Sequence, residues 1–109
     1  MQLAFATPSI RATCESSAVA RRALGHERAR VLRARISDLW AAESMLDLPA
    51  GRPVPCDRRA RRMRLPLSGG FCLIIVPNQR KVPKRRDGRV NWERVYRIKI
   101  EAIEEPNAD

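Results

Sequence analysis

Apolar and polar residues alternate in the second half of the chain, and this pattern predicts β-strands. Over residues 61–67, three apolar side chains would fall on one face of a strand and two arginines on the other: Met63, Leu65 and Leu67, against Arg62 and Arg64. Pro66 indicates that this strand is near its end or irregular there. Residues 70–77 are almost continuously apolar, which is typical of a buried central strand. Ser68, Gly69 and Gly70 predict a hairpin turn between the two strands.

A final strand is expected to begin at Trp92 and to alternate as well. Its apolar face would carry Tyr96, Ile98, Ile100 and Ala102, and its polar face Arg97, Lys99 and Glu101. The preceding segment, residues 78–91, is charged and interrupted by Pro83 and Gly88, so we expect a mobile loop. Residues 104–109 are mostly acidic and are expected to form a frayed tail.

Helical spacing dominates the first half of the chain, after a short strand predicted at residues 2–6. Thr7 and Pro8 suit the capping and first positions of a helix, which would end at about Leu24, before Gly25. A second helix is expected from His26 to about residue 46. Its apolar residues recur at steps of three and four: Leu32, Ile36, Leu39, Ala42 and Leu46. Three prolines and a glycine within residues 49–55 predict a connecting loop.

These elements predict an α+β fold in a single domain, residues 1–109, with the order strand, helix, helix and then a three-stranded antiparallel meander. We expect the two helices to be antiparallel and to pack on one face of the sheet. The buried contacts would join Leu32, Ile36 and Leu39 to Met63, Leu65 and Ile98. The opposite face would then present four cations: Arg62, Arg64, Arg97 and Lys99.

The uneven distribution of charge along the chain indicates a binding surface on this fold. The net charge is +10, and residues 51–109 hold fifteen basic residues against seven acidic ones, whereas residues 1–50 hold seven against five. Two arginine-rich patches, residues 58–64 and 80–86, flank the central strand. Concentrated cations suit a polyanion, and a phosphate backbone is the usual partner, so we expect RNA binding. A solvated basic surface is the alternative.

Other classes of site are disfavoured by composition. Cys14, Cys56 and Cys72 are far apart and His26 is the only histidine, so no structural zinc site is expected and a reducing cytoplasm fits best. We expect neither a signal peptide nor a membrane-spanning segment, because no sufficiently long apolar run is present. Trp40 and Trp92 are expected to be packing residues.

Several stretches resemble the HigB branch of the RelE/ParE toxin superfamily, the plasmid-maintenance killer proteins. Leu39–Ser44 and Leu46–Pro49 resemble the end of the family's second helix, and Phe71–Pro77 resembles its central strand. Pro83–Gly88 and Asn91–Val95 resemble the charged loop that enters the last strand, and Ile98–Ile100 and Ile103–Glu104 follow it. The resemblance covers most of the chain and implies a RelE/ParE-like fold.

The resemblance also implies a function and partners. Such proteins are type II toxins that cut mRNA on the ribosome without a metal or cofactor, and a helix-turn-helix, HigA-like antitoxin holds them inactive, in some cases on operator DNA. The family's conserved arginine segment falls on Asp57–Arg61, with Arg59 in the arginine position, and Lys99 matches a basic residue of the last strand. We therefore predict catalytic roles for Arg59, Arg62, Arg64 and Lys99. We predict RNA contacts from Arg58, Arg61, Arg97, Lys84, Arg85 and Arg86.

The chain also departs from the family pattern. Cys72 stands where the family has an arginine, Pro53 lies near the position of a histidine, and Glu105, Pro106 and Asn107 replace a terminal segment with tyrosine and histidine. Three hypotheses remain open: an active mRNA endoribonuclease, a weakened toxin-like protein that binds RNA, ribosome or antitoxin without cleavage, and a ParE-like inhibitor of DNA gyrase. The alternative for Arg58, Arg59, Arg62 and Arg64 is that they protect an exposed strand edge, and Lys99 could be an ordinary outward-facing residue.

Overall fold

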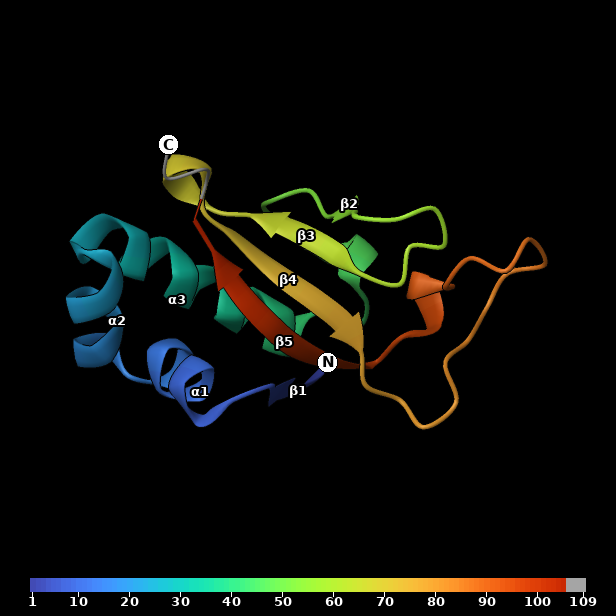
Figure 1. The fold of residues 1–109 in the computed structure, drawn as a ribbon, viewed down its shortest axis with the longest axis horizontal. Coiled ribbons are helices and arrows are strands. Elements are labelled where there is room, and N and C mark those ends of the chain that lie inside the picture. The colour runs from blue at the N-terminus through green and yellow to red at the C-terminus, as the bar shows by residue number, and fades with distance from the viewer. Residues whose placement is uncertain (106–109) are drawn as a thin grey trace.

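Five strands form one mixed sheet in the order β1-β5-β4-β3-β2 in the computed structural model, which describes residues 1–105 (Figure 1). The strands are β1 (Gln2–Phe5), β2 (Val54–Pro55), β3 (Met63–Pro66), β4 (Cys72–Pro77) and β5 (Arg97–Glu104). The expected antiparallel meander is confirmed as β3, β4 and β5, with the apolar β4 at its centre. The first strand, β1, pairs in parallel with β5. The edge strand β2 lies within the expected loop at residues 49–55 and pairs with β3.

Three α-helices precede the meander, where two were expected: α1 (Pro8–Glu15), α2 (Ser17–Leu24) and α3 (His26–Ala41). The first expected helix is interrupted at Ser16, whose backbone is extended, with φ −114° and ψ 120°. The hydroxyl of Ser16 accepts a hydrogen bond from the Val19 N–H at 3.2 Å and thereby caps α2. Thr7 caps α1 as predicted, because its hydroxyl accepts a bond from the Ile10 N–H. Gly25 ends α2, also as predicted.

The helix α3 ends earlier than its apolar spacing suggested. It stops at Ala41, and a single 3₁₀ turn at Met45–Asp47 follows, capped by the hydroxyl of Ser44. This turn changes which side chain reaches the interior, so Met45 is fully buried whereas Leu46 is 54% exposed. The prediction that Leu46 belongs to the core stripe is therefore wrong.

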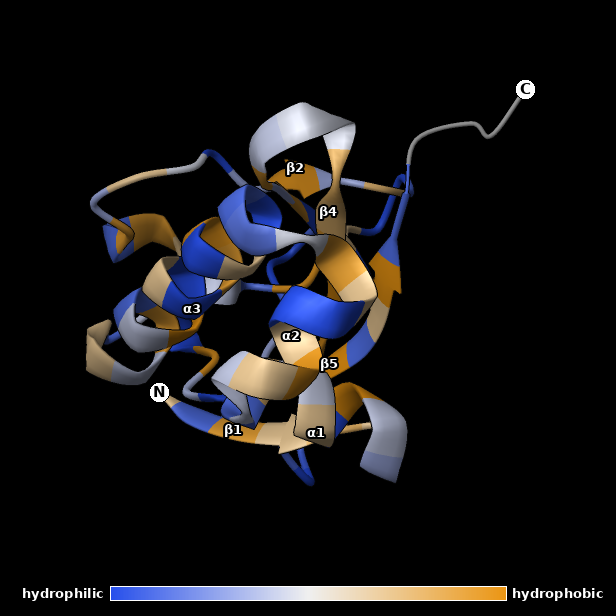
Figure 2. Ribbon diagram, turned by 90° about the vertical axis from the view of Figure 1, so that its left-hand side faces the viewer, coloured by the Kyte–Doolittle hydropathy of each residue, from blue (hydrophilic) through white to orange (hydrophobic). Residues whose placement is uncertain are grey.

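The core lies between α3 and one face of the sheet. Leu32, Ile36 and Leu39 share a buried cluster with Met63, Leu65 and Ile98, which confirms the predicted contacts. In Figure 1, α3 passes behind β4 and β5, and in Figure 2 it shows hydrophilic and hydrophobic residues on successive turns. The helix α1 packs against β1 and β5, while α2 packs mainly on α3. The side of the sheet opposite α3 is called the helix-free face below.

The strand β5 is shorter and less regular than its sequence pattern suggested. It begins at Arg97, because residues 92–94 form a 3₁₀ turn, and Tyr96 is 55% exposed. Ile100 pairs with Ile75 but Ala102 pairs with Ile74, so Glu101 is the extra residue of a β-bulge. Beyond the bulge the alternation reverses. Ala102, predicted to share a face with Ile98 and Ile100, lies on the helix-free face, and Ile103 packs against the core in its place.

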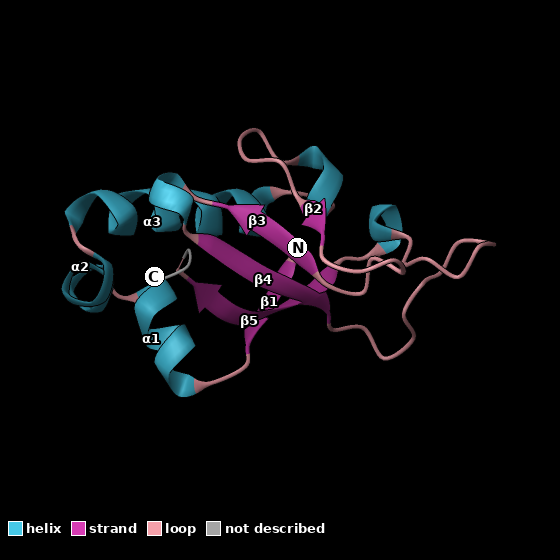
Figure 3. Cartoon of the chain, turned by 45° about the horizontal axis from the view of Figure 1, so that its top comes forward, coloured by secondary structure: helices cyan, strands magenta, loops and turns pink. Residues whose placement is uncertain are grey.

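Residues 78–91, where a mobile loop was expected, form an arm with backbone hydrogen bonds of its own. Lys84 and Val90 form an isolated antiparallel bridge, and a turn at residues 85–88 closes the tip. Val90 is buried in the core cluster and anchors the base of the arm. Figure 3 shows the arm extending away from the sheet. The predicted tail falls mostly on residues 106–109, outside the described residues, although Glu104 still belongs to β5. Among residues 1–105, no helix is long and apolar enough to cross a membrane.

Candidate nucleic-acid interface

Two arginines of the third strand project from the helix-free face, as the alternation predicted. Met63 and Leu65 are buried beneath α3, so Arg64 between them faces the other way, and Arg62 does so one position before the strand begins. Both arginine side chains are exposed. The burial of Met63 and Leu65 therefore determines which way the two arginine side chains point.

Lys99 and Arg97 lie on the same face, but not beside the arginines of β3. Ile98 and Ile100 are fully buried, which turns Lys99 and Arg97 outward. Lys99 pairs with Val76 of β4 on one side and with Ala4 of β1 on the other. Because β4 separates β5 from β3, the backbones of Lys99 and Arg62 are about 10 Å apart, which is twice the spacing between neighbouring strands. The four cations thus share one face of the sheet but form two rows, one along β3 and one along β5.

A tight turn presents the next three predicted cations, Arg58, Arg59 and Arg61. The Ala60 N–H donates to the carbonyl oxygen of Asp57 at 3.1 Å, and the Arg61 N–H donates to a carboxylate oxygen of Asp57 at 2.9 Å. Ala60 has φ of +54°, a left-handed conformation that favours glycine. The turn holds all three arginine side chains in solvent.

The arm is joined to this turn, which brings the two arginine-rich patches to one end of the molecule. The Val90 N–H donates to the carbonyl oxygen of Arg59 at 2.9 Å, and the indole N–H of Trp92 donates to that of Ala60 at 2.6 Å. Trp92 is buried, so its predicted packing role is confirmed, whereas Trp40 is 52% exposed and that prediction is wrong. The exposed cations of the arm include the three that were predicted to contact RNA, Lys84, Arg85 and Arg86. The turn at residues 57–61 and the arm at residues 78–91 are together called the basic end below.

Carboxylates share the helix-free face, which makes it less purely cationic than predicted. Glu101 accepts an ion-paired contact from Arg62 at 2.9 Å, and the two line a cleft of about 430 Å³ with Asp57, Arg61 and Val76. Glu101 lies on this face because it is two residues beyond Lys99 on β5. A neighbouring hollow is lined by Cys56, Arg62, Arg64, Ile74, Glu101, Ala102 and Glu104. The alternation placed Glu101 on this face correctly, but no sequence pattern indicated its pairing with Arg62, because the two residues are far apart in the chain.

Cys72 occupies this face where the resembling family carries an arginine. Burial raises the pKa of the Cys72 thiol, and the nearby Arg64 opposes that rise only in part. A raised pKa keeps the thiol protonated at neutral pH and therefore a weak nucleophile. Cys14 is similar, since burial raises its pKa to about 12. The two buried cysteines are thus packing residues.

The described part of the chain contains no cluster of three histidine, cysteine or acidic side chains that could hold a metal ion. Comparison with models of protein families, with curated proteins and with solved structures finds no match to this chain. The helix-free face and the basic end are therefore the features from which a function can be inferred, together with the resemblance noted in the sequence.

Proposed function

We propose that this protein binds mRNA on the ribosome and cleaves it, as the toxin of a type II toxin–antitoxin pair acting in the cytoplasm. The observation that carries the proposal is the pairing of Arg62 with Glu101 in a cleft on the helix-free face, next to the basic end. Arginine keeps its charge at every relevant pH, and its fork fits phosphate oxygens. A HigA-like helix-turn-helix antitoxin is the proposed partner. Its acidic segments would bind the helix-free face, and the complex of toxin and antitoxin would bind operator DNA.

The cleft places the two chemical roles of RNA cleavage within reach of each other. Arg62 and Arg64 would bind the scissile phosphate and stabilise the charge that develops on it. The Glu101 carboxylate would accept the proton of the ribose 2′-hydroxyl. The 2′ oxygen then bonds to phosphorus while the bond from phosphorus to the 5′ oxygen breaks, and that oxygen takes a proton from water. The products are a 2′,3′-cyclic phosphate and a 5′-hydroxyl, and no metal enters the step.

The basic end would hold the flanking backbone. Arg61 lines the cleft, Arg58 and Arg59 belong to the same turn, and the arm joined to that turn adds the cations of residues 84–86. Phosphate contacts of this kind position a nucleic acid without reading its sequence. Lys99 and Arg97 extend the same face across β4 to the far side of the sheet.

Induced expression in bacteria tests the proposal. The wild-type chain should arrest growth, and mapping of mRNA 5′ ends should reveal new cuts with codon periodicity. The variant carrying Arg59→Ala, Arg62→Ala and Arg64→Ala should be at least about 10²-fold less active, since each lost donor to a developing charge costs that order of magnitude. A charge-matched control changes Arg11, Arg22 and Arg52 to Gln. Arrest that survives in the triple alanine variant would remove this face from the mechanism, and arrest with DNA damage signalling instead of mRNA cuts would indicate a gyrase inhibitor.

The substitution Glu101→Gln separates binding from cleavage. Loss of the general base should lower the cleavage rate by about 10²–10⁴-fold. RNA affinity should rise instead, because Arg62 loses its internal counterion and the face gains one unit of positive charge. Fluorescence anisotropy and single-turnover cleavage on programmed ribosomes measure the two effects. Glu93→Gln, on an exposed residue of the 3₁₀ turn before β5, is the control. Cleavage at the wild-type rate in Glu101→Gln would rule Glu101 out as the base.

RNA binding without cleavage is the second candidate function. The observation that favours it is the same ion pair: Glu101 neutralises part of the charge of Arg62, and the hollow beside it holds a second carboxylate, that of Glu104. Under this reading the wild-type chain binds RNA or antitoxin, leaves mRNA uncut, and does not arrest growth on induction. The Glu101→Gln experiment then shows tighter binding with no cleavage in either protein.

A further inference from the structure

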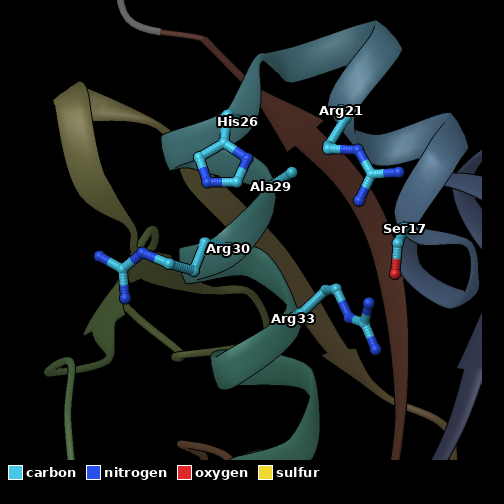
Figure 4. Close-up of a pocket in the computed structure, with 6 residues that line it drawn as sticks. All are labelled: Ser17, Arg21, His26, Ala29, Arg30 and Arg33. Atoms are coloured by element: carbon cyan, nitrogen blue, oxygen red, sulfur yellow. The ribbon is translucent and has the colours of Figure 1, made fainter.

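A second cationic groove lies between α2 and α3, away from the face considered so far. It has a volume of about 280 Å³ and is lined by Ser17, Arg21, His26, Ala29, Arg30 and Arg33 (Figure 4). In Figure 1, α2 and the start of α3 lie at one end of the long axis, whereas the arm lies at the other. No role was predicted for these arginines from the sequence.

Small residues and helical spacing build the groove. Ala20 of α2 and Ala29 of α3 are both almost fully buried, which lets the two helices approach closely. On α2, Ser17 and Arg21 are four residues apart and therefore share a face. On α3, residues 26, 30 and 33 share a face for the same reason. Long basic side chains thus line both walls above a floor of small apolar ones.

The three arginines of the groove differ in how their charge is balanced. Arg30 binds the carboxylate of Glu27 with two contacts, at 2.6 and 3.3 Å, and this pairing lowers the pKa of Glu27. Within residues 1–105, Arg21 and Arg33 have no carboxylate within 4.0 Å. Figure 4 shows their guanidinium groups on the side of the groove where Ser17 lies, while Arg30 extends to the opposite side. Two guanidinium groups without counterions and one hydroxyl therefore surround the same space.

We propose that this groove binds a phosphate group, through Arg21, Arg33 and the hydroxyl of Ser17. A tetrahedral phosphate accepts hydrogen bonds from several directions, which matches donors that come from two helices. A planar carboxylate is satisfied by a single arginine fork, as Glu27 is by Arg30, so an acidic peptide fits this arrangement less well. A nucleic-acid backbone and a free anion are the two sources of such a phosphate group. The site is separate from the helix-free face and does not require that face to be catalytic.

Titration with inorganic phosphate, followed by amide and arginine side-chain NMR signals of the whole chain, tests the site directly. Saturable shifts should appear at Ser17, Arg21 and Arg33, and they should be lost when Arg21 and Arg33 are changed to Gln. The control variant, Arg22→Gln with Arg52→Gln, removes the same charge outside the groove and should keep them. Absence of shifts at these residues in the wild-type protein would overturn the proposal, even if a variant failed to fold. So would saturable shifts there with a short glutamate peptide but none with phosphate.

A second experiment identifies the source of the phosphate. For single-stranded RNA, each phosphate contact contributes about 0.7 to the slope of log affinity against log salt, so loss of the groove should reduce that slope by about 1.4 if both arginines contact backbone phosphates. An unchanged slope combined with phosphate shifts would identify a free phosphate or nucleotide as the ligand. Neither experiment measures growth or cleavage, so failure of the proposed RNase activity would leave this site standing, and the reverse also holds.

Discussion

The indole N–H of Trp92 donates to the carbonyl oxygen of Ala60 across 32 residues of sequence, and both groups are buried. This bond and the one from the Val90 N–H to Arg59 hold the arm against the turn. The turn itself contains a residue at positive φ, Ala60, a conformation that costs a non-glycine residue about 1–2 kcal/mol. The Trp92 side chain therefore offsets the strain at Ala60 and holds the cations of the turn next to those of the arm.

Trp92→Phe is the prediction at this scale. It keeps most of the apolar contact but leaves the Ala60 carbonyl without a donor, which should lower the free energy of unfolding by about 1–3 kcal/mol. Chemical denaturation measures this loss. Trp40→Phe is the matched control, because Trp40 is half exposed and its change should stay within about 0.5 kcal/mol. Equal effects of the two substitutions would mean that the indole hydrogen bond does not secure the turn.

At the residue scale, the sequence predicts the direction of a side chain where one face of a strand must be buried. Arg62 and Arg64 could be assigned because their neighbours Met63 and Leu65 had to be buried. The pairing of Arg62 with Glu101 could not be assigned, since it depends on the register of β3, β4 and β5 and on an extra residue that no local preference marks.

The helical elements depend on brief interruptions of the backbone. Ser16 separates α1 from α2, and Gly25 separates α2 from α3 with φ 88° and ψ 167°, a region that is almost restricted to glycine. Sequence reasoning found Gly25 and missed Ser16, because glycine and proline are strong breakers whereas serine is tolerated within a helix as well as at its cap. The end of α3 was missed because Leu46 continued the apolar spacing.

Gly25→Ala is the prediction at the element scale. A methyl group at this position would meet no atom within 4 Å, so the cost comes from the backbone conformation alone. We expect the free energy of unfolding to fall by about 1–3 kcal/mol, with the loss of helical signal in circular dichroism following the same transition. Ala23→Ser, at an exposed position of α2, should change it by less than about 0.5 kcal/mol. A neutral Gly25→Ala would mean that the junction of α2 and α3 can adopt another conformation.

The whole molecule measures 43 × 30 × 26 Å, and its cations gather at two ends and across one face. The basic end and the groove between α2 and α3 are separated along the long axis (Figure 1). The α+β class and the central meander followed from alternation alone. The contact between residues 58–61 and residues 84–90 could not be predicted from the sequence. A charged segment with proline and glycine carries little information on where it packs, and only the buried Val90 and Trp92 show the place of contact.

Removal of the arm's charge is the prediction at this scale. The variant with Lys84, Arg85 and Arg86 changed to Gln should bind single-stranded RNA more weakly. Its salt slope should fall by about 2, since each lost phosphate contact contributes about 0.7. Anisotropy of labelled RNA across a range of KCl concentrations measures this. The control that changes Arg11, Arg22 and Arg52 should alter the slope little, and an unchanged slope in the arm variant would show that the arm does not contact RNA.

The bulge at Glu101 also governs how any related chain must be compared with this one. A chain that lacked the additional residue would keep strict inside-outside order along its last strand, and its positions beyond Ile100 would match these only after a gap of one. Without that gap, an alignment would equate residues of the core with residues of the helix-free face.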